Sequence, residues 1–193
     1  PAYLAAYPGL FSFDGPLQAL YYHDGVLDAH HPLLSTALLG IWIDIGHAVF
    51  GSYQGGLALY SLFQGACLAA TFAYTLCFMR RYKAPKLLVF GSLVFFALNP
   101  FFQIFVFATI KEVLFGSALL LLGLFSLDLI LQPDAFFKRP LLQLRYAVTA
   151  LLMCLLRNQG IYILVVFIPF CVWACRGHRM RLTGLCLAVV ALY

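Results

Sequence analysis

Residues 55–79 read GGLALYSLFQGACLAATFAYTLCFM, a run without a charged side chain. As an α-helix this run would be about 37 Å long at 1.5 Å per residue, which exceeds the roughly 30 Å hydrocarbon core of a bilayer. The rest of the chain is similar, because 64% of its 193 residues are hydrophobic and only 10% are charged, whereas soluble domains carry about a quarter charged residues. The sequence therefore predicts an all-α, polytopic membrane helix bundle.

Further apolar runs follow this segment and predict more membrane helices. Residues 87–110 are interrupted by Asn99 and Pro100. Since proline breaks or kinks a helix, we expect a helix to about Leu98 and a bent segment after it. The remaining runs cover residues 113–131, 141–156 and 161–175. We interpret residues 55–193 as the transmembrane helices of a single membrane domain that comprises residues 1–193.

Neither end of the sequence has the features of a natural chain terminus. The sequence begins at Pro1, without a methionine and without the basic and apolar regions of a signal peptide. Its last apolar run, residues 182–193, is shorter than the roughly 20 residues that a spanning helix needs. We therefore expect a fragment of a longer protein, lacking at least one upstream helix and several downstream ones.

The distribution of basic side chains predicts the orientation in the membrane. If residues 55–79 cross from outside to inside, all twelve Lys and Arg residues except Lys111 and Arg157 fall on the cytoplasmic side. This distribution agrees with the rule that cytoplasmic loops carry the excess of Lys and Arg. Residues 1–54 are then an outer-face juxtamembrane segment of a multi-pass plasma-membrane protein.

Residues 32–50 are the ambiguous element of this topology. They are apolar but carry Asp44 and His47, which are costly at the centre of a bilayer. We therefore interpret residues 32–50 as lying in the membrane surface. The alternative is a full crossing, which would place the preceding polar segment in the cytoplasm.

The polar segment 11–40 reads FSFDGPLQALYYHDGVLDAHHPLLSTALLG and gathers much of the ionisable chemistry. It holds three of the seven acidic residues and three of the five histidines, namely Asp14, Asp24, Asp28, His23, His30 and His31. Ionisable groups near hydrocarbon are expensive and usually functional. The segment is therefore our candidate for the catalytic part of the chain.

Several of these side chains are candidate ligands for a polar substrate. Asp24 and Asp28 suit sugar hydroxyls or a divalent cation, although solvated loop carboxylates explain them as well. His30 and His31 suit an acceptor or a phosphate group, and adjacent side chains point different ways, so at most one faces the site. A metal site built from these four residues stays open, but their spacing matches no zinc template.

Lys111 and Arg157 are the only two cations that this topology places outside. Lys and Arg are natural partners of phosphate groups, so both are candidates for binding an anionic donor. The neighbouring Glu112 and Asn158 are further candidates for binding the substrate. The alternatives are an ion pair between Lys111 and Glu112, or snorkelling of Lys111 to the interface, and interfacial anchoring by Arg157.

The order of these motifs resembles the GT-C superfamily of membrane glycosyltransferases, of the protein mannosyltransferase and aminoarabinose transferase type. The matching residues are Asp14 in FSFDGP, the run HHPLL at 30–34, and Phe50 with Gly51. Asp14 is followed by Gly15, where the mannosyltransferase pattern has a second acid. The segments NPFFQIFVFATIKEVLF (99–115) and LLRNQGIY (155–162) resemble an uncharacterised bacterial branch of GT-C-like proteins.

This resemblance implies an enzyme that moves a sugar from a polyprenyl-phosphate donor to a glycan, lipid or protein acceptor on the outer face of a bacterial membrane. In an inverting transfer a carboxylate removes the proton of the attacking hydroxyl, and Asp14 is the candidate general base. The structural alternative is that Asp14 caps a helix beginning near Pro16.

Two other functional classes compete with this interpretation. One is a transporter or flippase for a polar or lipid-linked substrate, since broken helices and intramembrane charges occur there too. The other is a non-catalytic membrane scaffold of the same fold. The basic residues lie in short links between apolar runs and no nucleic-acid motif is present, which argues against nucleic acid as a partner. All six cysteines lie in apolar runs and are expected to be buried thiols.

Overall fold

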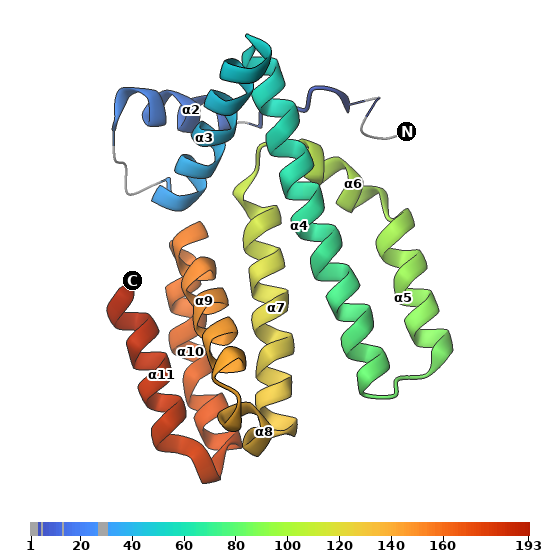
Figure 1. Cartoon of the computed structure of the whole chain (residues 1–193), viewed down its shortest axis with the longest axis vertical. Helices are drawn as coiled ribbons and strands as arrows, with labels where there is room; N and C mark the ends of the chain where they lie inside the picture. The colour runs from blue at the N-terminus through green and yellow to red at the C-terminus, as the bar shows by residue number, and fades with distance from the viewer. Residues whose placement is uncertain (1–3, 5, 13, 27–30) are drawn as a thin grey trace. The chain divides into compact units, whose positions relative to one another are not determined.

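The computed structural model describes residues 4, 6–12, 14–26 and 31–193. This described part is helical, with no strand beyond one isolated parallel bridge between Leu10 and Ala108. The chain divides into two compact units, residues 1–114 and 115–193 (Figure 1). The predicted all-helical architecture is thus confirmed, and each unit is described by itself.

The first unit covers residues 1–114. Its helices are α2 (Gly15–Asp24), α3 (Leu33–Phe50), α4 (Tyr53–Arg81), α5 (Lys86–Leu98), α6 (Pro100–Phe107) and the first turn of α7 (Lys111–Leu131). The second unit contains the rest of α7 with α8 (Pro133–Lys138), α9 (Pro140–Leu156), α10 (Gln159–Ala174), the short 3-10 helix η1 (Arg176–His178) and α11 (Arg179–Leu192).

Three helices of the described chain are long and apolar enough to cross a membrane, and the chain is therefore compatible with a multi-pass membrane protein. They are α3, α4 and α7, and the bent pair of α5 and α6 makes a fourth if it counts as one span. The segment predicted at 55–79 is α4, which begins after Ser52, whose hydroxyl accepts a hydrogen bond of 3.2 Å from the Gln54 N–H. By length and composition α3 qualifies as a span, and its interfacial placement stays a prediction.

The predicted break at Asn99 and Pro100 is confirmed. Helix α5 ends at Leu98, α6 begins at Pro100, and their axes differ by 45°. The Asn99 side chain accepts a hydrogen bond of 3.0 Å from the Phe101 N–H. The break follows from local chemistry, because Pro100 lacks the N–H that would continue α5 and Asn99 caps the next helix.

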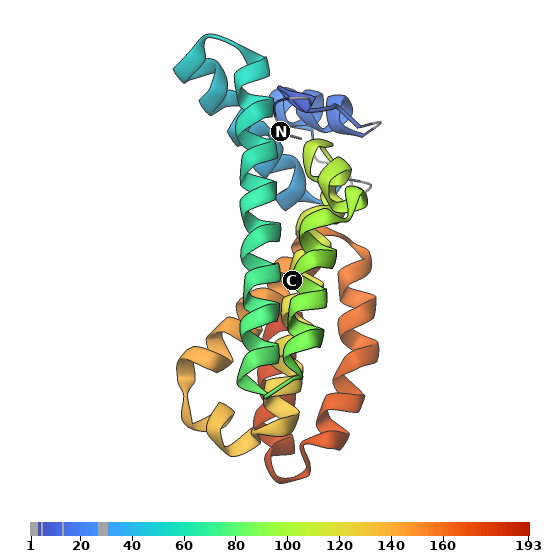
Figure 2. The same ribbon diagram turned by 90° about the vertical axis from the view of Figure 1, so that its right-hand side faces the viewer.

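Helices α3 and α4 form a close hairpin in the first unit (Figure 2). A Cβ atom on Gly46 would collide with the backbone of Gly56, so the two helices touch backbone to backbone at this point. Beside this contact, Leu39, Ile43 and Tyr60 form a buried cluster. Small residues allow such an approach between apolar helices, and the contact area that results holds them together.

Replacing Gly46 by valine should separate the two helices and destabilise the protein by about 1–3 kcal/mol, the usual cost of overpacking a tight contact. Thermal unfolding of the purified protein measures this effect. Gly91→Val is the matched control, because Gly91 also lies within a helix and nothing lies within 4 Å of its Cβ position. Equal melting temperatures for the two variants would contradict the proposed role of the glycine contact.

The second unit is a bundle of α9, α10, α11 and the larger part of α7 around a buried core. Leu129, Tyr146, Met153, Leu164 and Leu182 are at most 1% exposed. The predicted burial of the cysteines holds for Cys154, Cys171, Cys175 and Cys186, but it is wrong for Cys77, which is exposed on α4, while Cys67 is half-buried. Cys77 is exposed although it lies in a long apolar helix, so an apolar sequence context did not imply burial.

Candidate functional site

The candidate site of the first unit is built on the break between α6 and α7, at residues 108–110. The break leaves carbonyl groups without helical partners. Gln64, on α4 and completely buried, supplies the missing donor: its Nε2 lies 3.0 Å from the Ala108 oxygen and 3.4 Å from the Val106 oxygen. Because buried carbonyls need hydrogen bonds, Gln64 holds the start of α7 at a defined position against α4.

The amino-terminal segment binds to the same break. The Leu10 N–H donates to the Phe107 oxygen at 2.7 Å, and the Thr109 N–H donates to the Leu10 oxygen at 2.9 Å. Ser12 then makes two bonds to the buried Thr109: its N–H donates to Oγ1 at 2.9 Å and its hydroxyl donates to the carbonyl oxygen at 2.6 Å. Gly15 completes the fit, since a Cβ atom there would collide with the Thr109 side chain.

This docking brings Asp14 to Lys111. Lys111 Nζ lies 3.3 Å from Asp14 Oδ2, and the two residues are 97 positions apart in the sequence. The Lys111 side chain is 12% exposed and the Asp14 side chain is 45% exposed, so the cation is shielded and the carboxylate is open to solvent. Asp14 occupies the cap position of α2, but its side chain makes no capping hydrogen bond and is directed to Lys111 instead.

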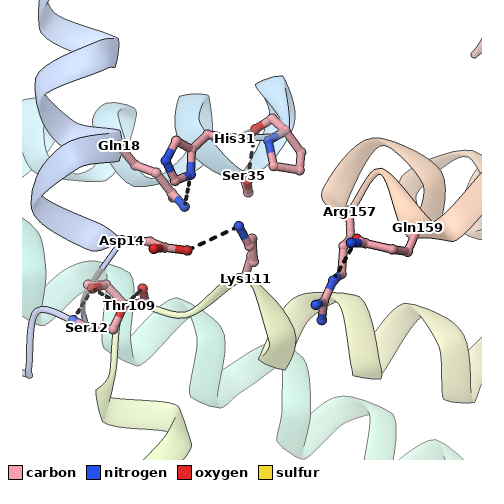
Figure 3. Close-up of polar contacts among 10 residues, drawn as sticks. Ser12, Asp14, Gln18, His31, Ser35, Thr109, Lys111, Arg157 and Gln159 are labelled. Carbon is pink, nitrogen blue, oxygen red and sulfur yellow. Dashed lines mark hydrogen bonds and ion pairs between the residues drawn. The ribbon is translucent and has the colours of Figure 1, made fainter. Parts of the chain in front are cut away.

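A second polar contact is made from the same face of α2. Gln18 follows Asp14 by four residues, which places both side chains on one side of the helix. Gln18 Nε2 lies 3.4 Å from Nδ1 of the buried His31, whose ring also meets Tyr21 edge-on at 5.6 Å between centroids. Figure 3 shows this pair with Asp14, Lys111 and Ser35. His31, in the HHPLL run, is thus buried against α2.

The other predicted residues of the polar segment do not join this group. Asp24 is exposed at the opposite end of α2 from Asp14, about 15 Å away along a ten-residue helix. Helix α2 ends there because Gly25 adopts a left-handed conformation with φ of 65°. Asp28 and His30 lie outside the described residues. Among the residues that the structure describes, no three His, Cys, Asp or Glu side chains are grouped to hold a metal ion.

Arg157 and Asn158 belong to the second unit. Arg157 Nε donates to Gln159 Oε1 at 2.9 Å, and the guanidinium lies 5.7 Å from the centre of the Phe115 ring. Gly160 packs against the backbone of Met153, so the turn between α9 and α10 is tight. The contact of Arg157 with a donor phosphate and the binding of substrate by Asn158 stay predictions. Glu112 lies half-buried in the first turn of α7, where the helix dipole favours an acid.

Two polar residues of α3, Asp44 and His47, contact side chains of neighbouring helices. The Tyr22 hydroxyl donates a hydrogen bond to the exposed Asp44, and this bond is the main reason why the pKa of Tyr22 is raised. The His47 ring lies 4.5 Å from that of Tyr53. Both contacts join α3 to a neighbouring helix, so they explain Asp44 and His47 as structural groups.

Four residues of the site were not among the predicted ligands: Ser12, Thr109, Gln18 and Gln64. Gln64 donates hydrogen bonds from α4 to the carbonyl groups of Val106 and Ala108. A weak signal for the others was present in the sequence, since Ser12 precedes Asp14 by two residues and Thr109 precedes Lys111 by two. This spacing alone does not indicate that the two segments meet.

Residues 20–193 match a protein family that is described as a family of unknown function, DUF6020. The matched range includes His31, Lys111 and Arg157, whereas Asp14 and Gln18 precede it. No curated protein and no solved structure matches the chain.

Proposed function

The chain belongs to DUF6020, a family of unknown function, and we propose that it is a membrane glycosyltransferase. It moves a sugar from a polyprenyl-phosphate donor to a glycan, lipid or protein acceptor at the outer membrane face. The observation that carries this proposal is the Asp14–Lys111 pair, in which a shielded cation lies beside a solvent-accessible carboxylate. The motif order that resembles GT-C glycosyltransferases adds support and supplies the substrate class.

Asp14 and Lys111 suit the two charge changes of such a transfer, the loss of a proton by the acceptor and the growth of negative charge on the leaving phosphate. An acceptor hydroxyl oxygen attacks the anomeric carbon, the bond from that carbon to the phosphate oxygen breaks, and the lipid phosphate leaves with the electron pair. Asp14 accepts the hydroxyl proton, and Lys111 stabilises the negative charge that grows on the departing phosphate. Charge-assisted contacts of this kind are stronger when the cation is partly desolvated, as Lys111 is.

The surrounding structure supports this division of roles. The two bonds between Ser12 and Thr109 join positions that lie two residues before Asp14 and Lys111, so they support the placement of the carboxylate and the ammonium group in advance of substrate. Lys111 is the first residue of α7, whose amino-terminal end carries partial positive charge and favours an anion. Without donor, Asp14 neutralises Lys111; with donor, the phosphate takes that place and the carboxylate turns to the acceptor.

The remaining candidate residues are proposed as substrate ligands, and those of the second unit rest on the resemblance alone. Gln18 lies on the face of α2 that carries Asp14, and His31 contacts Gln18, so both suit contacts with acceptor or sugar hydroxyls. Arg157 and Asn158 are proposed as further donor-phosphate ligands, and Glu112 as a sugar ligand. Asp24 lies at the far end of α2 from Asp14, and we leave it out of the proposed site.

A transporter or flippase is the second candidate, and the bent pair α5–α6 is the observation that favours it, since discontinuous helices form substrate sites in transporters. The same assay tests both candidates. The full-length protein is placed in lipid vesicles with radiolabelled polyprenyl-phosphate sugars and an extract of acceptors. We expect label to leave the donor and appear in a new product. Donor that crosses the vesicle membrane intact would instead indicate transport.

The membrane orientation is a separate prediction. A membrane-impermeant thiol reagent should label Asp24→Cys in intact cells and label Lys86→Cys only after permeabilisation. The first position lies in the predicted outer segment, and the second is the first residue of α5, next to the basic turn. The unsubstituted protein, with its exposed Cys77, supplies the background. The reverse labelling pattern would place the Asp14–Lys111 pair on the cytoplasmic side and exclude an outer-face enzyme.

A further inference from the structure

A cavity of the first unit lies where residues 82–85 join α4 to α5. Figure 1 shows this junction at the end of α4 that is far from α3. Its volume is about 770 Å³, and it lies between the last turns of α4 and the first turns of α5. Arg80, at its edge, follows Gln64 by sixteen positions on α4, which corresponds to about 24 Å along the helix. The cavity is therefore distinct from the candidate active site.

Three cations line this cavity: Arg80, Lys83 and Lys86. All three are exposed, and within the described part of the chain no carboxylate pairs with them. Arg81 differs, because its guanidinium lies over the rings of Phe78 and Tyr82, at 5.2 and 5.3 Å from their centres. The three cations of this region that line the cavity are therefore exposed and available to bind an anion, whereas Arg81 lies over aromatic rings.

The backbone of the turn contributes to this arrangement. Lys83 has a φ of 55°, a left-handed conformation that is uncommon for a residue with a side chain. Helix α5 begins directly after the turn and has no acidic residue in its first turn. Its amino-terminal end therefore adds partial positive charge to that of the three side chains.

The walls of the same cavity are apolar. Leu76 on α4 and Val89, Phe90 and Leu93 on α5 line it, and Phe90 and Leu93 are 63% and 48% exposed. A second cavity, on another face of α5, has apolar residues and Ser92 in its lining and no charged residue. The cavity at the turn is therefore the place in this hairpin where a hydrocarbon surface adjoins a group of cations.

We propose that this cavity binds an anionic phospholipid, with the headgroup phosphate between Arg80, Lys83 and Lys86 and an acyl chain along Leu76, Val89, Phe90 and Leu93. The charge complementarity selects an anion, and the apolar walls select a lipid over a soluble phosphate. Basic pockets between membrane helices bind anionic headgroups on the cytoplasmic side, and the excess of Lys and Arg assigns this turn to that side.

The test counts lipids on the purified full-length protein by native mass spectrometry after incubation with phosphatidylglycerol or phosphatidylcholine. We expect one phosphatidylglycerol to be retained in preference to phosphatidylcholine. The variant carrying Arg80→Gln, Lys83→Asn and Lys86→Gln should lose this retention at least about tenfold, since each basic residue near the surface contributes to anionic-lipid binding. Asparagine is chosen at position 83 because it tolerates positive φ.

The matched control removes the same charge elsewhere on the predicted cytoplasmic side, by Lys138→Gln, Arg139→Gln and Arg145→Gln, three exposed residues of the second unit. The control should retain phosphatidylglycerol as the unsubstituted protein does. Equal loss in both variants would show general charge attraction and overturn the site. Displacement of the lipid by millimolar glycerol phosphate would show a soluble-phosphate site and overturn the lipid assignment. Asp14→Asn should leave retention unchanged, so this result is independent of the proposed catalysis.

Discussion

Replacing Asp14 by asparagine should abolish sugar transfer while leaving expression and donor binding nearly intact. Asparagine preserves the size of the side chain but cannot accept a proton from the acceptor hydroxyl. Loss of a general base typically lowers the rate by about 10²–10⁴. The Ser12–Thr109 bonds do not involve the Asp14 side chain, so the segment should keep its position. Single-turnover transfer in lipid vesicles measures the rate.

Asp24→Asn is the matched control for this experiment. It makes the same chemical change on the same helix, but Asp24 is exposed at the end opposite to Asp14. Its transfer rate should be that of the unsubstituted protein. Full activity in Asp14→Asn would end the assignment of Asp14 as the base. Loss of activity only in Asp24→Asn would make Asp24 the candidate and show that the Asp14–Lys111 pair is structural.

Replacing Lys111 by alanine should weaken donor use, because it removes the shielded cation proposed to bind the donor phosphate. A hydrogen bond to a charged group contributes roughly 1.5–3 kcal/mol, which corresponds to roughly a 10- to 150-fold increase in the apparent donor KM. The acceptor KM should change much less. Steady-state transfer at varied donor and acceptor concentrations separates these two parameters.

Lys111→Arg and Lys138→Ala serve as controls for this prediction. Arginine keeps the positive charge and should restore most of the donor affinity, whereas Lys138 is exposed in the second unit and its removal should change neither parameter. A variant Lys111→Ala that melts at a lower temperature but keeps the donor KM would show that Lys111 only fastens α7 to the amino-terminal segment. That outcome would contradict its role in donor binding.

The helices of this protein could be predicted from the sequence because the signals that specify them are local. The apolar run at 55–79 became α4 (Tyr53–Arg81), and the pair Asn99–Pro100 separated α5 from α6 as expected. Each of these outcomes depends on side chains within a few positions: an uninterrupted apolar run favours a membrane helix, and proline lacks the donor that a helix needs. Candidate chemistry at Asp14, His31 and Lys111 was also visible, since ionisable residues are rare in this chain.

The sequence by itself thus determined the helices, the break in the α5–α6 pair and a short list of chemical groups. Only the tertiary structure decided that Asp14 meets Lys111, with Asp24 left at the far end of α2. The physical reason is that a break between two helices exposes backbone groups that must find partners. The partners at residues 106–109 come from Gln64 and from Leu10 and Ser12, and no local pattern encodes that choice.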